Sequence, residues 1–335
     1  MDQYWLDGHY NGEGAYNPAI VQTSRFKLKD KKVLMCWRSG DDNSVLEMGW
    51  FYFNNHSVVK DPRMTVDPLV IDPDTSTMED ARVIETSSST IAVIFSGSFS
   101  RFSMLLPNYR GTMQLIAYGT FNEASGLYEF KDSQGQSTTR WLKYPENQKN
   151  WTPFMHEGEL LFFQSINPIH VVRAVKTATS DTDKILSVET VTKSEVVTNL
   201  PWDGSIYGGH IRGGSAVVMV RGLMLSFFHT ENVMTKINPL KTYFMGVATF
   251  CPKAPFQIHS MSQYPILKSG MYEGKWANRY CNYVMFPMGV IVDEKEEFLY
   301  VSIGYQDRYG IIIKMDIDGL LDSLELVASC DTEKS

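Results

Sequence analysis

The stretch Met78-Glu79-Asp80-Ala81-Arg82-Val83 places its Asp80 eleven residues ahead of an apolar run that starts at Ile91. Four further motifs precede an apolar run in the same way, the last of them with a hairpin longer by five residues: Lys149 before Leu160, Arg212 before Leu223, Pro287 before Phe298, and Asn17 before Val33. Short strands repeated at a period of about 60 to 75 residues are typical of a β-propeller, in which each repeat forms one blade.

The repeats predict an all-β fold, a single five-bladed β-propeller domain that covers residues 1–335. The expected blades are roughly 15–75, 78–145, 148–205, 208–275 and 280–330. An open ring would expose two sheet edges, so we expect the N-terminal segment to join the last blade. The clearest helix signal is residues 316–322, where one turn is expected.

Composition and charge exclude several classes of protein. A net charge of -7 argues against a nucleic-acid surface, which needs a basic stripe. No apolar run approaches the roughly 20 residues of a membrane span, and the polar start lacks the apolar region of a signal peptide. We therefore expect a cytoplasmic protein with neither a nucleic-acid nor a membrane partner.

The cysteines and histidines give no metal signature. The four cysteines, Cys36, Cys251, Cys281 and Cys330, have no CxxC spacing, and we expect buried free thiols rather than a disulfide or zinc site. The seven histidines show neither HxH nor HExxH spacing. Two Asp-x-Asp pairs, at 72–74 and 316–318, are interpreted as turns. The expectation is no metal and no cofactor.

The innermost strands of a propeller run beside its axis, so equivalent positions form a ring. The first ring contains Asn17, Asp80, Lys149 and Arg212, which sets one carboxylate opposite two cations. A ligand site and a structural ion network both satisfy that electrostatic arrangement. A second ring, at the ends of the apolar strands, contains Arg38, Ser96 and Ser165, with His229 one residue out of register.

Several motifs resemble those of a known enzyme family. The stretches Tyr16-Asn17-Pro18-Ala19, Trp37-Arg38-Ser39, Glu79-Asp80-Ala81-Arg82, Phe286-Pro287-Met288-Gly289 and Gly304-Tyr305-Gln306-Asp307 resemble the five-bladed mannoside phosphorylases of glycoside hydrolase family 130. Three others, Gln148–Phe154, Ser165–Pro168 and Arg212–Ala216, are more similar to the protozoan β-1,2-mannosyltransferase/phosphorylases of glycosyltransferase family 108. The resemblance implies inverting chemistry between an α-mannosyl donor and a β-1,2-mannoside.

The resemblance also implies roles for individual residues. Asp80 matches the general acid/base, and Asn17, Arg38 and Asp307 match positions that hold the transferred mannosyl unit. We add Arg82 and His229 to the sugar-binding set. For Asn17 a cap of the turn before Pro18, and for Asp307 a plain turn residue, are the structural alternatives.

Phosphate requires converging cations, and Lys149 and Arg212 match the family's phosphate positions, with arginine in place of the more usual lysine. A third cation that is common in the phosphorylases is replaced here by Asn167, which leaves room for a larger donor. His210 and Tyr207 flank Arg212 and are expected at the mouth of the pocket, or else in a loop without a role.

The sequence thus predicts an inverting β-1,2-mannosyltransferase/phosphorylase acting on β-1,2-oligomannosides. Its expected donors are α-mannose-1-phosphate, GDP-mannose or both, with phosphate as the partner in the reverse direction. A β-mannoside hydrolase is one alternative, and it would need a second carboxylate, Glu79 or Glu231, to activate water. A non-catalytic mannoside-binding propeller is the other, because Asn167 and Ala81 depart from the family pattern.

Overall fold

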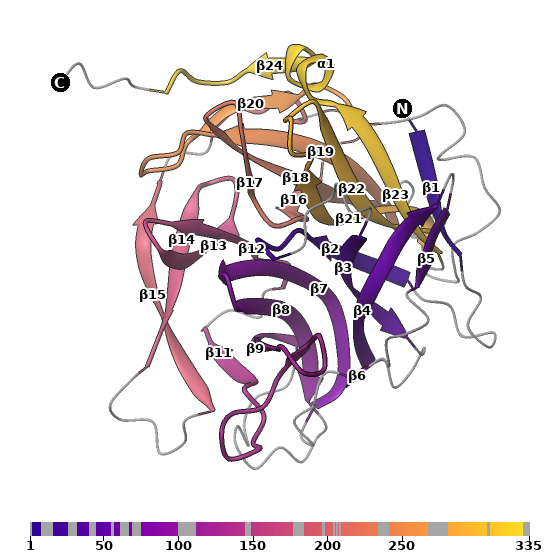
Figure 1. The fold of residues 1–335 in the computed structure, drawn as a ribbon. Helices are drawn as coiled ribbons and strands as arrows, with labels where there is room; N and C mark the ends of the chain where they lie inside the picture. The colour runs from indigo at the N-terminus through magenta and orange to yellow at the C-terminus, as the bar shows by residue number, and fades with distance from the viewer. Residues whose placement is uncertain are drawn as a thin grey trace.

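The computed structural model consists of antiparallel strand groups that follow one another around a common centre (Figure 1). It describes residues 2–7, 16–25, 32–39, 45–54, 57–60, 67–68, 75–99, 112–144, 149–176, 184–195, 198–203, 205, 207, 209–233, 241–266, 281–306 and 309–330. Almost every regular element within these ranges is a β-strand.

The first two groups are antiparallel meanders. The first contains β2 (Tyr16–Val21), β3 (Lys32–Ser39), β4 (Val45–Asn54) and β5 (Ser57–Lys60), with β6 (Asp67–Pro68) paired to β4. The second contains β7 (Thr75–Ser87), β8 (Thr90–Phe99), β9 (Thr112–Asn122), β10 (Leu127–Glu129) and β11 (Arg140–Lys143), the last two both paired to β9.

The third and fourth groups repeat this arrangement. The third contains β12 (Thr152–His156), β13 (Glu159–Ser165), β14 (His170–Val175) and β15 (Ile185–Lys193). In the fourth, β16 (His210–Gly213) and β17 (Val218–Val220) pair with β18 (Leu223–Val233), followed by β19 (Lys241–Phe250) and β20 (Ile258–Ser262).

The fifth group is completed by the start of the chain. It contains β21 (Cys281–Val292), β22 (Phe298–Tyr305), β23 (Tyr309–Asp316) and β1 (Asp2–Asp7). β1 pairs antiparallel with β23 and parallel with β5, so the predicted joining of the N-terminal segment to the last group is confirmed. In Figure 1 the chain runs around the centre, and yellow β23 returns beside indigo β1 and β5.

The predicted helical turn is also present. α1 (Ile317–Asp322) starts after Asp316, whose side chain accepts a hydrogen bond from the backbone N–H of Gly319 as an N-cap. β24 (Leu324–Leu326) then pairs with β20. No helix in the described part of the chain is long and apolar enough to cross a membrane.

The core is divided into clusters that lie between neighbouring groups. Separate clusters join the first group to the second, the second to the third, the third to the fourth, the fourth to the fifth, and the fifth back to the first. β8 explains the continuous apolar runs of the sequence. Successive side chains of a strand point to opposite faces, so Ile91 and Val93 pack in one cluster while Ala92 and Ile94 pack in the next.

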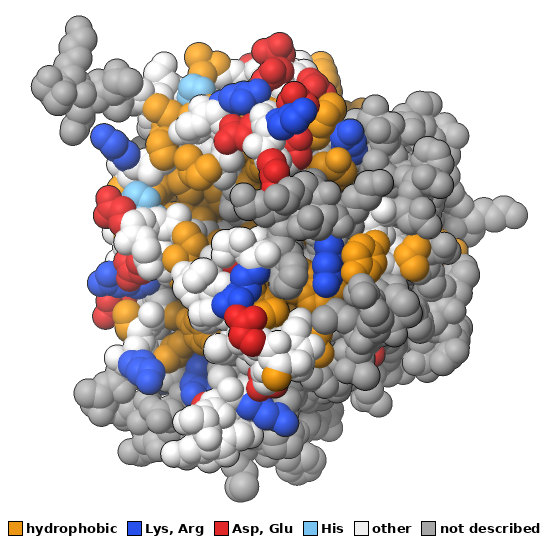
Figure 2. All heavy atoms as spheres, in the orientation of Figure 1, with side chains coloured by type: hydrophobic (Ala, Val, Ile, Leu, Met, Phe, Trp, Pro, Cys, Tyr) orange, Lys and Arg blue, Asp and Glu red, His pale blue; other side chains and the backbone are white. Residues whose placement is uncertain are grey.

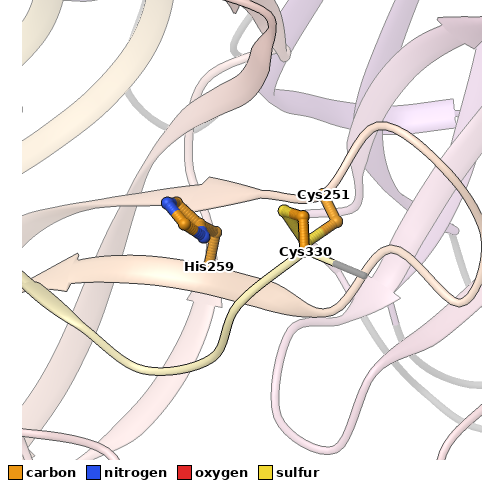
Figure 3. Close-up of side chains that lie close together, drawn as sticks. All are labelled: Cys251, His259 and Cys330. Atoms are coloured by element: carbon orange, nitrogen blue, oxygen red, sulfur yellow. A yellow bond between two sulfur atoms is a disulfide. The ribbon is translucent and has the colours of Figure 1, made fainter. Parts of the chain in front are cut away.

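One expectation from the sequence is wrong. Cys251 and Cys330 form a disulfide with a Cα–Cα distance of 5.5 Å, although 79 positions separate them (Figure 3). The segment after β24 returns to β20, where the N–H groups of Val327 and Ala328 donate to the carbonyl of His259. That return brings the two cysteines together. Cys36 is a buried free thiol as predicted, and the side chain of Cys281 lies outside the described residues.

Charges of both signs are interspersed on the face seen in Figure 2. Among the side chains coloured there, lysine and arginine lie next to aspartate and glutamate, without a field of one sign. Described ion pairs on the surface include Arg173 with Glu159 and Glu189.

Candidate active site

A cavity of about 360 Å³ opens where the innermost strands of the five groups come together. All four residues of the predicted first ring line it, as do Arg38 and His229 of the second ring. The complete lining is Asn17, Arg38, Glu79, Asp80, Lys149, Asn150, Arg212, His229, Glu231, Lys241, Tyr243, Val284 and Phe286. Its volume is at the lower end of the range of small-molecule sites.

Asp80 occupies a β-bulge of β7. The pairing with β8 is regular from Thr77 to Glu79 and resumes at Arg82, which leaves Asp80 and Ala81 without direct partners in the ladder. The backbone of Asp80 is left-handed, with φ of 56°, a conformation that aspartate and asparagine tolerate better than most residues. A bulge of this kind re-aims a side chain, and here the buried carboxylate of Asp80 faces the cavity.

The same geometry recurs in two other groups. Asn17 on β2 has φ of 53° and Asn150, just before β12, has φ of 69°. The antiparallel ladder resumes two residues after Asn17, at Ala19, and begins two residues after Asn150, at Thr152, just as it resumes two residues after Asp80. The third-group counterpart of Asp80 is therefore Asn150, and the register predicted through Lys149 was one residue early.

Asp80 contacts two other predicted site residues. The Nδ2 of Asn17 donates to its Oδ1 at 3.2 Å, and the Nζ of Lys149 lies 3.7 Å from its Oδ2. Glu79 lies 3.8 Å from the same Nζ and 3.6 Å from Nη2 of Arg38. These ion-pair distances are longer than the 2.7–2.9 Å or so of a charge-assisted hydrogen bond. Lys149 and Arg38 are therefore close enough to balance the charges of the two carboxylates.

Arg82 lies beneath the cavity and does not line it. Its Nε donates to the carbonyl of Gly214 at 2.6 Å, its Nη2 to that of Gly213 at 3.4 Å, and its Nη1 to Oδ1 of Asn150 at 3.0 Å and to the carbonyl of Asp80. The guanidinium thus fixes the backbone on both sides of the cavity. In the structure Arg82 positions Asp80 and Asn150, and the direct sugar contact expected from the sequence does not fit this location.

Burial and local backbone packing explain this arrangement. Desolvation lowers the pKa of Arg82 to about 10, with the charge of Asp80 opposing the shift, so the guanidinium stays charged at neutral pH. The backbone at Gly213 approaches the third group closely. A Cβ on Gly213 would lie 2.2 Å from Oγ1 of Thr152 and 2.3 Å from the carbonyl oxygen of Asn150, so only glycine fits there.

Three adjacent strands form the opposite wall. Arg212 on β16 pairs in register with His229 on β18, and Glu231, two residues further along β18, pairs with Tyr243 on β19. Alternate residues of a strand share a face, so Lys241 and Tyr243 both reach the cavity. The Nζ of Lys241 lies 2.8 Å from Oε1 of Glu231, and the hydroxyl of Tyr243 donates to its Oε2 at 3.3 Å.

His229 and Glu231 differ in charge state. Burial, followed by the positive charges of Arg82, Arg212 and Lys149, holds the pKa of His229 well below its usual range, so its imidazole is neutral at neutral pH. Burial alone would raise the pKa of Glu231, but the hydrogen bond and charge of Lys241 outweigh it and lower that pKa. Glu231 is therefore a carboxylate.

The other predicted site residues lie elsewhere. The side-chain amide of Asn167 exchanges two hydrogen bonds with the backbone of Thr198, at 2.9 and 3.0 Å, and does not line the cavity. Tyr207 packs its ring against Trp202 and Phe244. His210 is exposed at the start of β16.

Two further expectations concern Asp307 and the second ring. Asp307 lies outside the described residues. Ser96 and Ser165 do not line the cavity, and the Oγ of buried Ser96 accepts a hydrogen bond from Gln114 at 3.4 Å. All residues of the first ring therefore line the cavity, whereas the second ring contributes only Arg38 and His229.

Sequence reasoning missed Asn150, Lys241 and Tyr243. Asn150 follows Lys149 in the same motif, and its chemical likeness to Asn17 is a signal that could have identified it. Lys241 and Tyr243 belong to β19, which lies outside the repeated motif and the apolar run that follows it. No pattern in the sequence points to them.

Among the described residues, no group of three His, Cys, Asp or Glu side chains close enough to share an ion lines this cavity. Within the described ranges, the His, Cys, Asp or Glu group close enough to share an ion is Cys251, His259 and Cys330, and its two cysteines are joined to each other (Figure 3). What the cavity offers is one buried carboxylate, two further carboxylates and four cations around a space suited to a polar ligand.

Neither a protein-family model nor a curated protein matches the chain by sequence. Solved structures do match it. A β-1,2-mannobiose phosphorylase from Listeria innocua, in complex with β-1,2-mannobiose, is 15% identical over 96% of this chain and 99% of that chain, with a TM-score of 0.59. A GDP-Man-dependent mannosyltransferase from Leishmania mexicana is 11% identical over 95% and 90%, with a TM-score of 0.53.

A mannose phosphorylase from Leishmania mexicana, in complex with a phosphate ion, is 12% identical over 100% of this chain and 94% of that chain, with a TM-score of 0.50. These structures represent the two groups whose motifs the sequence resembles. The likeness shows that the chain has the all-β, propeller-type fold of the mannoside phosphorylases and mannosyltransferases.

Proposed function

We propose that the protein is an inverting enzyme that transfers mannose to and from β-1,2-oligomannosides. The observation that carries the proposal is the environment of Asp80: a buried carboxylate, hydrogen-bonded by Asn17, with Lys149 beside it in a cavity that Arg212 also lines. An inverting phosphorylase requires one carboxylate that transfers a proton and a cationic binding site for phosphate, which is its nucleophile. The fold shared with mannoside phosphorylases supports the same proposal.

In the phosphorolytic direction, Asp80 supplies the proton that the departing oxygen takes as the glycosidic C–O bond breaks, directly or through a sugar hydroxyl. A phosphate oxygen forms the new bond to the anomeric carbon from the opposite face, which gives α-mannose-1-phosphate. Phosphate is already nucleophilic, so no second carboxylate is needed to activate it. In the reverse direction, Asp80 accepts the proton of the acceptor hydroxyl.

The proposed sugar contacts are Asn17, Arg38 and Asp307, with His229 as a neutral neighbour of the ring. Lys149 and Arg212 bind the donor's phosphate, and the proposed donors are α-mannose-1-phosphate and GDP-mannose.

The five strand groups are proposed to be the five blades of one propeller domain covering residues 1–335. Five core clusters, each between successive groups, support that count. A cytoplasmic location is proposed as well, and Cys251 and Cys330 provide its test. Disulfides are rare in reducing compartments, so alkylation in intact cells would find both thiols free; a fully oxidised pair would contradict this location.

A second candidate is a β-mannoside hydrolase. It is favoured by one observation: Glu79 and Glu231 line the same cavity as Asp80 and are both carboxylates at hand to activate water. Burial would raise the pKa of Glu231, but Lys241 lowers it overall, which makes this glutamate a weaker base and favours the phosphorylase.

One set of incubations separates the candidates. The protein is given β-1,2-mannobiose with phosphate, the same sugar without phosphate, and GDP-mannose with the sugar as acceptor. Formation of mannose-1-phosphate from mannobiose and phosphate, or of longer mannosides from GDP-mannose, supports the proposal. Free mannose without phosphate identifies the hydrolase, and Asp80→Asn is expected to lower either activity about 10²- to 10⁴-fold. Mannoside binding without turnover would identify a non-catalytic binding protein.

A further inference from the structure

The wall formed by β16, β18 and β19 contains an ion pair that the proposed reaction does not use. Lys241 and Glu231 both line the cavity, and their Nζ and Oε1 atoms lie 2.8 Å apart. Tyr243 completes the cluster through its hydroxyl, which donates to the other oxygen of Glu231 at 3.3 Å. While this ion pair is intact, the Glu231 carboxylate therefore occupies both the Lys241 ammonium group and the Tyr243 hydroxyl, which lie beside Arg212.

Arg212 has unused hydrogen-bonding capacity at this place. Its Nε is buried and finds no hydrogen-bond partner among the residues that the structure describes. A buried donor without a partner is costly, and a guanidinium binds phosphate oxygens well because its N–H groups form a planar fork. An oxyanion bound here would supply the missing acceptor.

Another anion can replace Glu231 as the partner of Lys241 at little cost in stability. The Lys241 side chain is 44% exposed and that of Glu231 25%, and partly exposed ion pairs contribute little to stability. A phosphate group carries more charge and more acceptor oxygens than a carboxylate, so it can take Lys241 from Glu231. A neutral sugar hydroxyl has neither advantage.

We propose that Lys241 is the third cation of the donor-phosphate seat, with Arg212 and Lys149, and that Glu231 is its resident counter-ion, which a phosphate group displaces. The ligands are inorganic phosphate and phosphate esters such as a sugar 1-phosphate. This inference rests on the proposed function, since it specifies how the same cavity binds its donor.

The test is calorimetric titration of the full chain with inorganic phosphate, which needs no turnover. Lys241→Met is expected to raise the Kd for phosphate about tenfold, through loss of one charge-assisted contact, and Lys241→Arg to restore most of it. Glu231→Gln is expected to lower the Kd about threefold, because the competing charge is gone. Lys193→Met and Glu195→Gln, which break an exposed pair at 3.6 Å outside the cavity, serve as matched controls and should leave the Kd unchanged.

The decisive result is that the Lys241 and Glu231 substitutions change the Kd for phosphate in opposite directions. A pair that only stabilises the fold would weaken phosphate binding in both variants or in neither, and either result overturns the inference, as does a parent that binds no phosphate. Turnover of β-1,2-mannobiose is measured separately. Mannose-1-phosphate formation with a phosphate Kd that neither variant changes would reject the role of Lys241 and leave the proposed function standing.

Discussion

The side-chain amide of Asn17 donates a 3.2 Å hydrogen bond to the carboxylate of Asp80, across 63 positions of sequence. Both residues have left-handed backbones in bulges of innermost strands, and this shared geometry points the two side chains at each other. Gly304 on β22 lies directly behind the amide of Asn17.

Gly304→Ala is expected to displace Asn17 from Asp80. A Cβ at this position would lie 1.9 Å from Oδ1 of Asn17, which forces the amide to move. Misplacement of a catalytic group by about 1 Å costs on the order of 100-fold in rate, and we expect a loss of that size in kcat/KM for mannosyl transfer. Gly49→Ala is the control, since its Cβ would meet Trp37 at an ordinary 3.4 Å. Equal activity of both variants would contradict the positioning of Asp80 by Asn17.

Arg82→Met is expected to lower the free energy of unfolding by about 3 kcal/mol or more, because the backbone carbonyls of Asp80, Gly213 and Gly214 lose their donor. Urea denaturation measures the effect. Arg173→Met is the matched control: Arg173 is bound to two exposed glutamates on the surface, and its loss should leave the midpoint within error. A stable Arg82→Met protein with full activity would show that the guanidinium neither supports the fold nor places Asp80.

His229 predicts a dependence of stability on pH. The pKa of its imidazole is held well below 6.5 in the folded protein, while the unfolded chain binds a proton near 6.5. Below pH 6.5 the unfolded state therefore holds more protons, and the free energy of unfolding falls as pH falls, by about 1.4 kcal/mol per unit from this residue until the folded pKa is reached.

Above pH 6.5 this contribution is constant. Denaturation curves for the parent and His229→Gln between pH 5 and 8 measure the difference in slope, which should be confined to the range below 6.5. Identical slopes for the parent and His229→Gln would mean that the imidazole takes up its proton in the folded state.

The Cys251–Cys330 disulfide is expected to stabilise the protein by about 2–4 kcal/mol, because it closes a loop of 79 positions in the unfolded chain. Reductant should lower the denaturation midpoint of the parent to that of the Cys251→Ser, Cys330→Ser double variant, and should not affect the variant itself. A parent whose midpoint is the same with and without reductant would contradict the pairing in solution.

Much of the site could be read from the sequence because the propeller repeat brings equivalent positions together. Asn17, Asp80, Lys149, Arg212 and Arg38 were all identified from spacing, and all line the cavity. Tyr207 and His210 were chosen for their nearness in sequence to Arg212, and Asn167 through the resemblance to the phosphorylases; all three lie outside the cavity. Nearness along a strand does not predict a shared face, because successive residues point in opposite directions.

The sequence by itself determined the strands, their order and the positions of the motifs, because strand formation and turn chemistry depend on residues close together in the chain. Only the tertiary structure decided that Asn150 continues the register of Asp80, that Lys241 and Glu231 meet at the cavity, and that Cys251 reaches Cys330. Those relationships arise from pairing and packing between distant segments, where small differences in register and in the path of the backbone decide which side chains touch.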